Sequence, residues 1–202
     1  MRTPRLESRV VLVVATIAVA VGGTAIGIAA TRHEPQAFLR APKAGDTLPP
    51  QAARFLHPGA SRRVAAFRSS GSSHAVFVNR SQDGSQICVW DTELASGAQA
   101  GGCNPSGDFF AGHAFTVSLS YDGGPTLASV HNARIVGIVS EEVASIEVVY
   151  TDRGSRRVAI TPDRAFAHAV PNGVLRNGVA PIAVVARNAA GDEIDRQETR
   201  ID

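Results

Sequence analysis

Hydrophobic positions beyond residue 63 occur in short runs that are separated by polar clusters. In residues 64 to 130 the runs predict about five β-strands, at VAAF, HAVFVN, ICVWDT, AFTVSLSY and TLASV. Residues 133 to 202 predict about six more, at ARIVGIVS, ASIEVVYT, RRVAITP, AFAHAV, PIAVVARN and EIDRQETRI. The separating clusters, such as SQDGSQ and NAAGDE, are rich in residues that turns favour. Because no convincing helical period interrupts the strands, the pattern predicts an all-β fold, specifically an antiparallel β-sandwich.

The stretch from 135 to 154, IVGIVSEEVASIEVVYTDRG, alternates as a half-buried strand does. Its apolar face holds Ile146, Val148 and Tyr150. Glu147 is then expected to point to solvent, while Glu141, Glu142 and Asp152 fall in the connections at the two ends of the strand. A general acid and base must converge on one bond, whereas a strand of about eight residues separates these carboxylates by roughly 25 Å. We therefore interpret them as turn residues.

A different pattern precedes the β region, because residues 10 to 31 contain no charged side chain. At about 1.5 Å per residue a helix of this length spans roughly 30 Å, which is the thickness of a bilayer core. The run predicts an uncleaved transmembrane signal anchor. Arg2, Arg5 and Arg9 favour a cytoplasmic tail at residues 1 to 9 and an external C-terminal part. The alternative is a signal peptide that is cleaved near residue 30, which would release a secreted protein.

The remaining chain divides by composition into three parts. Residues 32 to 63 hold five of the eleven prolines and predict a stalk, with one short helix at residues 51 to 56. Residues 64 to 132 form a Cys-containing β region, and residues 133 to 202 form a second β block. Each block is small for an independent sandwich, so the two are expected either to share a core or to form two domains.

The net charge and the spacing of two glycines indicate which binding partners to expect. The tail holds three of the 20 basic and one of the 18 acidic residues, which leaves 17 of each in residues 32 to 202. An external part without net charge gives no reason to expect nucleic-acid binding. In the apolar run, Gly23 and Gly27 have the G-x-x-x-G spacing of helix dimers, so a dimer through them is one candidate assembly.

The two cysteines, Cys88 and Cys103, lie 15 residues apart in a part of the chain that is expected outside the membrane. In an oxidising compartment such a pair predicts a disulfide. Structural zinc usually needs four ligands in close pairs, and no CxxC or HxxxH motif accompanies either cysteine. No cofactor or metal is predicted.

The stretches SRRVAAF (61 to 67), ICVW with the later GGC (87 to 90 and 101 to 103) and GIVSEEVASIEVVYTDRG (137 to 154) resemble uncharacterised cell-envelope proteins of actinobacteria. The C-terminal block is similar to the small immunoglobulin-like modules of bacterial surface proteins. This chain departs from the family pattern at residues 140 to 142, where Ser-Glu-Glu replaces Pro-Asp-Gly. The resemblance implies a membrane-anchored, immunoglobulin-like ectodomain, and it implies no catalytic residues.

Candidate chemistry is sparse. Ser72 and Ser73 adjoin His74, but neighbours on a strand point to opposite faces, so a nucleophile and base are not expected there. Three phenylalanines surround His113, which we interpret as packing. Among the acidic positions, three offer part of a calcium site, although a solvated hairpin tip is the simpler interpretation: Asp192, Glu193 and Asp195.

Aromatic residues gather in the Cys-containing region, where exposed rings provide a candidate surface for binding sugars or peptides. They are Trp90, Phe109, Phe110 and Tyr121. The same residues also suit a small β core, and that alternative stays open. The sequence thus predicts a membrane-anchored extracellular protein with a binding or structural role in the cell envelope. The alternative is a small extracellular hydrolase whose site is assembled from dispersed loops.

Overall fold

A computed structural model describes residues 35–50, 61–81, 83–124 and 126–201. Strands dominate this part of the chain: β1 (Arg62–Ser69), β2 (Ser72–Arg80), β3 (Gln86–Glu93), β4 (Gln99–Pro105), β5 (Ser118–Asp122), β6 (His131–Ile138), β7 (Ser145–Tyr150), β8 (Ser155–Val158), β9 (Ala165–Ala169), β10 (Pro181–Arg187) and β11 (Glu193–Glu198). The helical elements are short: η1 (Gln36–Leu39), η2 (Ala44–Asp46), η4 (Ser106–Asp108), η5 (Leu127–Ser129) and α1 (Asn172–Arg176).

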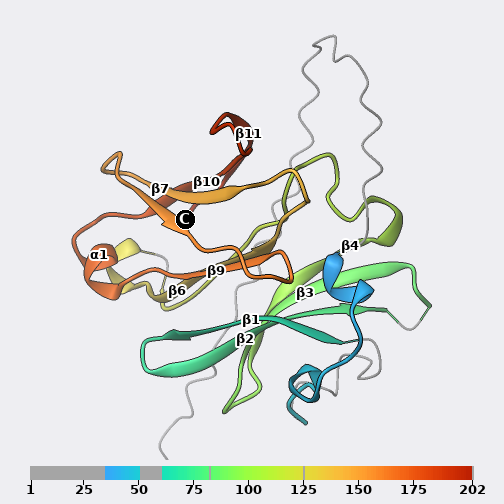
Figure 1. Cartoon of the computed structure of the whole chain (residues 1–202). Coiled ribbons are helices and arrows are strands. Elements are labelled where there is room, and N and C mark those ends of the chain that lie inside the picture. The colour runs from blue at the N-terminus through green and yellow to red at the C-terminus, as the bar shows by residue number, and fades with distance from the viewer. Residues whose placement is uncertain (1–34, 51–60, 82, 125, 202) are drawn as a thin grey trace, which may run out of the picture.

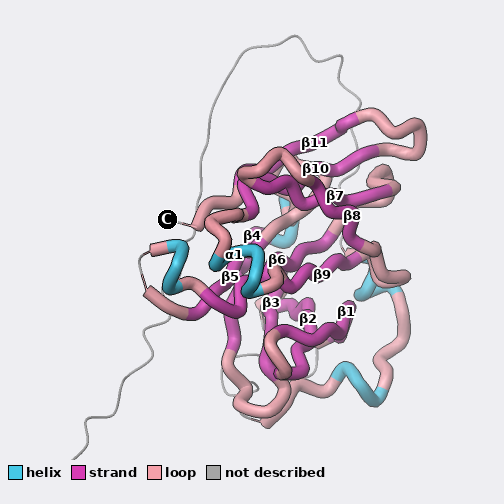
Figure 2. The backbone as a smooth tube through the Cα atoms, turned by 90° about the vertical axis from the view of Figure 1, so that its left-hand side faces the viewer, coloured by secondary structure: helices cyan, strands magenta, loops and turns pink. Residues whose placement is uncertain are grey.

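The strands form three antiparallel sheets that stack as layers (Figure 1). We call β1-β2-β3-β4 the meander sheet, β5-β6-β9 the middle sheet and β11-β10-β7-β8 the C-terminal sheet. The view in Figure 2 has the same order, with the C-terminal sheet at the top and β1 and β2 at the bottom. The described part is therefore all-β, as the hydrophobic pattern predicts, with sheets packed face to face as in a sandwich.

Strand β6 is buried on both faces and carries the two interfaces of the middle sheet. Val136 and Ile138 pack in a core with the meander sheet, at what we call the meander interface. Ala133 and Ile135 pack in a second core with the C-terminal sheet, at the C-terminal interface. Because side chains alternate along a strand, odd and even positions of β6 enter different cores. This accounts for a nearly continuous apolar run at residues 133 to 139.

The expected boundary between residues 132 and 133 falls inside β6. Strand β5, on the N-terminal side of that boundary, pairs with β6, and the core at the meander interface joins side chains from both predicted blocks. Ser118 pairs with Val136, and Leu119 pairs with Ile135. The two blocks therefore share a sheet and a core.

Two strand predictions differ from the structure. Residues 126 to 130, TLASV, contain the short 3-10 helix η5 (Leu127–Ser129), and the side chain of Ser129 forms hydrogen bonds with the backbone of Thr126. Strand β4 was not predicted, because its sequence, QAGGCNP, carries two glycines and no apolar alternation. It forms because it pairs with β3 along its whole length.

The predicted transmembrane segment at residues 10 to 31, the dimer glycines Gly23 and Gly27 and the stalk helix at residues 51 to 56 lie outside the described residues. Among the residues that are described, no helix is long and apolar enough to cross a bilayer.

Candidate functional site

A buried polar cluster crosses the meander interface. It joins His74 on β2, Asp91 on β3 and Arg134 on β6. The His74 ring nitrogen Nδ1 lies 3.0 Å from Asp91 Oδ1, and Arg134 Nε donates to Asp91 Oδ2 at 2.5 Å. The Asp91 carboxylate is only 2% exposed, so both of its oxygens are engaged away from water. We call this group the buried network.

Strand register brings these residues together. Asp91 pairs with Val76, and His74 pairs with Glu93, so His74 and Asp91 are diagonal neighbours on one face of the meander sheet. Arg134 occupies the same face of β6 as the core residues Val136 and Ile138. One carboxylate thereby connects three strands from two sheets.

Neighbouring residues add a ring contact and further hydrogen bonds around the buried network. The ring of Phe67 stacks on His74, with 5.2 Å between centroids. Arg134 Nη1 donates to the carbonyl oxygen of Asn132 at 2.7 Å. Hydroxyl donation by Ser72 and Ser96, followed by the nearby positive charges, lowers the pKa of Glu93 at the outer end of the cluster. A buried charge is tolerated where such partners surround it.

A histidine oriented by a carboxylate is half of a hydrolytic triad, and the other half is a hydroxyl or thiol on the second ring nitrogen. In the described residues, no Ser or Thr side chain hydroxyl is hydrogen-bonded to a histidine ring. The Ser72 hydroxyl instead donates to Glu93, and Ser73 pairs with Arg68 across the β1–β2 hairpin. In the structure, the side chain of Ser72 and the backbone pairing of Ser73 thus involve residues other than His74.

A second polar pair lies at the C-terminal interface. The Tyr150 hydroxyl is 2.6 Å from His168 Nε2, and the two rings meet edge to face. Burial raises the pKa of Tyr150, and burial together with the positive charge of Arg156 lowers the pKa of His168. Both groups are therefore neutral at pH 7, so this is a hydrogen bond between uncharged partners.

The acidic residues considered for calcium serve separate structural roles. Asp195 accepts hydrogen bonds from the backbone N–H of Ala114 at 2.7 Å and faces His113 Nδ1 at 3.2 Å. Asp192 accepts from the side chain of Asn188, within the β10–β11 hairpin. Glu193 pairs with Arg196. Throughout the described ranges, no three His, Cys, Asp or Glu side chains are grouped as a metal site would need.

The carboxylates at the ends of β7 are turn residues, as the alternation predicts. Glu141 accepts from Gln36 Nε2 at 3.0 Å, and Asp152 accepts from the backbone N–H of Gly154 at 2.9 Å. Glu142 accepts from Ser140. Glu147 lies on the strand face away from the core, where it is half-buried and pairs with Arg187.

The four aromatic residues that the sequence left open between a binding surface and a core have different surroundings in the structure. Phe109 and Phe110 are only 2% and 5% exposed and pack edge to face in the core of the meander interface. Trp90 is half-buried beside Leu48 on the other face of the meander sheet, and Tyr121 packs partly against the core of the C-terminal interface. Burial of the two phenylalanines removes the centre of that surface, because the apolar area between the sheets takes precedence over solvent exposure.

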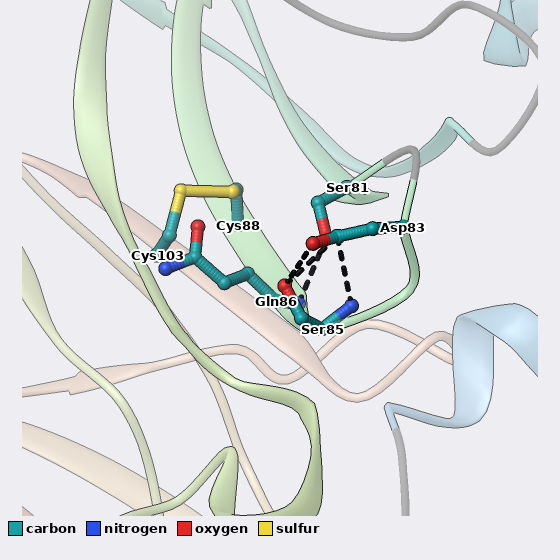
Figure 3. The surroundings of a disulfide bond; sticks show 6 residues. All are labelled: Ser81, Asp83, Ser85, Gln86, Cys88 and Cys103. Atoms are coloured by element: carbon teal, nitrogen blue, oxygen red, sulfur yellow. Dashed lines mark hydrogen bonds between the residues drawn. A yellow bond between two sulfur atoms is a disulfide. The ribbon is translucent and has the colours of Figure 1, made fainter.

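The disulfide prediction is confirmed, since Cys88 on β3 and Cys103 on β4 are bonded (Figure 3). The two residues are direct partners in the strand register. Next to them, the β2–β3 turn is closed around Asp83, whose carboxylate accepts from Ser81 and from Ser85. These hydrogen bonds lower the pKa of Asp83 to about 2.

An open cavity of about 400 Å³ lies at one end of β8. It is lined by Ala144, Ser145, Arg157, Val158, Ala159 and Ile160. Its walls are largely aliphatic, and the guanidinium of Arg157 is the only titratable side chain in them. The buried network and the Tyr150–His168 pair contribute nothing to this lining.

Sequence reasoning missed Asp91 and Arg134. The available signal was a charged residue at a position of a strand that the alternation assigns to the core, as in VWDT and ARIVGIV. A buried charge needs a partner, so each residue implied that a partner exists, but the local sequence does not identify a residue 43 positions away.

No family model, curated protein or solved structure matches this chain.

Proposed function

We propose that this protein is a single-pass envelope protein of an actinobacterium, with its β sheets outside the cell. There they bind or structurally engage a wall component or another envelope protein. The observation that carries the proposal is the Cys88–Cys103 disulfide, because such bonds persist in oxidising compartments outside the cytoplasm. The uncharged run at residues 10 to 31 supports an anchor, and cleavage after it, giving a secreted protein, is the alternative.

The strand order supports an immunoglobulin-like module within the layers. Strands β5 to β11 form a three-stranded sheet, β5-β6-β9, and a four-stranded sheet, β8-β7-β10-β11. Seven antiparallel strands divided in this way, with a shared core between the sheets, are the architecture of immunoglobulin-like sandwiches. On this interpretation the module begins at Ser118 rather than at residue 133, and the meander sheet is an addition to its outer face.

The polar contacts support a binding or structural role over the alternative of a small hydrolase. Each titratable group in the buried network is engaged by another strand rather than directed into a cavity. A hydrolytic site would need a histidine or carboxylate within about 3 Å of a nucleophile in a concave site. Neither the cavity beside β8 nor the Tyr150–His168 pair has that composition.

The first experiment tests location in intact cells of the native host. A maleimide that cannot cross the membrane is applied with and without reductant, and added protease is used to digest exposed parts. We expect the protein in the membrane fraction, accessible to protease, with thiols that react only after reduction. A soluble cytoplasmic protein with two free thiols contradicts the proposed location.

The second experiment tests engagement of envelope material. The detergent-solubilised full chain is incubated with isolated cell wall and with membrane extract, and co-sedimentation and crosslinked partners are measured. We expect retention by one of them. The same chain, reduced and heat-denatured before incubation, serves as the comparison for retention by unfolded protein. Absence of retention in both materials contradicts the binding role.

A further inference from the structure

Among the described residues, the C-terminal sheet ends in two edge strands that pair on one side only. Its order is β11-β10-β7-β8, so β8 and β11 each have a strand neighbour on one side only. At the edges of the other two sheets β1 lies against β9 and β4 lies against β5, while β8 also contacts β9. In the described residues, no backbone hydrogen bond joins the outer side of β8 or β11 to another strand. Such edges offer unpaired N–H and C=O groups to a further strand.

The two edges carry opposite charge. Strand β8, Ser155–Val158, contains Arg156 and Arg157 and no acidic residue. Both arginines are exposed and make no hydrogen bond or ion pair with any described residue. Strand β11 contains three acidic residues and one arginine: Glu193, Asp195, Glu198 and Arg196. Two of these carboxylates stay accessible, because Glu193 and Glu198 are engaged only in exposed ion pairs, which are weak and exchangeable.

Apolar features on the two edges are also complementary. Ile194 on β11 is 37% exposed and lies between two acidic residues, so it offers an apolar side chain at this edge. The open cavity of about 400 Å³ lies at the Val158 end of β8, with Ile160 in its wall. An apolar cavity of about 150 Å³ is enough for a benzene-sized group, so this space accommodates an isoleucine side chain.

We propose that copies of this protein associate head to tail, with β11 of one copy added to the β8 edge of the next. Main-chain hydrogen bonds extend the C-terminal sheet, Ile194 enters the cavity beside β8, and Glu193 and Glu198 face Arg156 and Arg157. Like pairing is opposed, because β8 against β8 brings arginines together and β11 against β11 brings carboxylates together. The contact joins two different surfaces, so it leads to open chains rather than closed dimers.

The test uses charge reversal on the full chain in detergent micelles, with sedimentation velocity as the readout. One variant, Arg156→Glu/Arg157→Glu, has two acidic edges, and the other, Glu193→Arg/Glu198→Arg, has two basic edges. We expect the native chain to form species larger than a dimer as its concentration rises. Each variant alone loses them, with association weakened about tenfold or more. An equimolar mixture of the two variants regains them, because every acidic edge then meets a basic one.

Controls separate this contact from other effects. Arg176→Glu, on α1 and away from both edges, is expected to associate as the native chain does. An intact disulfide and an unchanged far-ultraviolet circular dichroism spectrum establish that each variant folds. Ile194→Asp is expected to abolish the large species, and ionic strength near 1 M is expected to reduce them, since the screening length falls to about 3 Å.

Association through Gly23 and Gly27 stops at a dimer and is identical in every variant, so it cannot account for the mixing result. A native chain that stays monomeric or dimeric at all concentrations overturns the proposal. So does a mixture that fails to recover the species that the separate variants lose.

Discussion

At the meander interface a charged network is enclosed among aliphatic side chains, whereas the C-terminal interface holds an uncharged pair. In the first, the Asp91 carboxylate is engaged by His74 and Arg134. In the second, the contact is the hydrogen bond between Tyr150 and His168, beside a larger apolar core. A buried carboxylate with its partners removed is far more costly than a missing neutral hydrogen bond. The two interfaces are therefore expected to differ in how steeply they respond to the loss of one polar group.

The largest effect is expected for Asp91→Ala, which leaves Arg134 and His74 without their shared acceptor. Stability should fall by about 3 to 5 kcal/mol, as for other buried pairs that lose one partner. Urea unfolding at pH 7 measures the loss. Glu142→Ala, which removes an exposed turn carboxylate, is the control and should cost at most about 0.5 kcal/mol. The double variant Asp91→Leu/Arg134→Met should recover most of the stability that Asp91→Leu alone loses. Equal losses in these two variants contradict the network's role.

The next effect concerns the disulfide in the meander sheet. Cys88→Ala/Cys103→Ala opens a loop of 15 residues and should lower stability by about 3 kcal/mol. Urea unfolding of the variant with and without dithiothreitol gives the measurement. The native chain should lose a similar amount on reduction, while the variant should be insensitive to the reductant. A native chain that is equally stable when reduced would show that the bond contributes nothing.

An intermediate effect tests the close approach of strands at the C-terminal interface. A Cβ atom at Gly137 on β6 would meet the carbonyl oxygen of Thr116 and the ring of Phe166. Gly137→Ala should therefore cost about 1 to 3 kcal/mol, as overpacking does elsewhere. In the matched control, Gly173→Ala on α1, a Cβ meets nothing within 4 Å, and the change should be neutral or stabilising. Equal thermal midpoints for the two variants contradict the packing described.

A smaller effect is expected for Tyr150→Phe, which removes the hydroxyl that faces His168. The loss should be about 1 kcal/mol, since a typical buried hydrogen bond contributes this much. Tyr121→Phe is the control, because no described residue forms a hydrogen bond with the Tyr121 hydroxyl. If both tyrosine variants unfold at the same urea concentration, the contact at the C-terminal interface does not stabilise the fold.

The smallest effect is expected in the pH dependence of stability, where two titratable residues act in different pH ranges. Burial lowers the pKa of His168, so the unfolded chain binds the proton more readily. Its contribution is complete above the unfolded value of about 6.5 and is lost as the pH falls below it. Hydrogen bonds from Arg40 lower the pKa of Asp46, so its contribution is lost only below about pH 4.

Urea midpoints measured from pH 8 to pH 3 examine both windows. His168→Gln should remove the decline between about pH 7 and pH 5 and leave the one below about pH 4 unchanged. Asp46→Asn should do the reverse. A decline near pH 6 that persists in His168→Gln would assign it to another group.

Much of this fold was predictable from local pattern, and the two-sided packing was not. Alternation at Ile146, Val148 and Tyr150 predicts β7 and its buried face, and the spacing of Cys88 and Cys103 predicts the disulfide. The hydrophobic periodicity of the sequence alone does not predict that the even and odd positions of β6 enter two different cores. Strand β4, with its paired glycines, exists because β3 provides a partner, which no local propensity encodes.

Among the polar sites, too, the local contacts were predictable from the sequence and the contacts between distant strands were not. The turn roles of Glu141 and Asp152 were local and were predicted. The buried network depends on strand register between segments far apart in sequence, so neither Asp91 nor Arg134 indicated its partner. Phe109 and Phe110 left two interpretations open, which only the packing of one sheet on another could decide.

Burial of β6 on both faces also sets the kinds of sequence change that this protein tolerates. A one-residue insertion or deletion in β6 would exchange its two sets of side chains and move Arg134 from its carboxylate into the core around Phe166. No neighbouring layer could absorb that exchange. The exposed β10–β11 hairpin tip, at Asn188 to Asp192, has no such constraint and should accept added residues. Length variation among natural relatives should therefore accumulate in hairpin tips and be absent from the central strand.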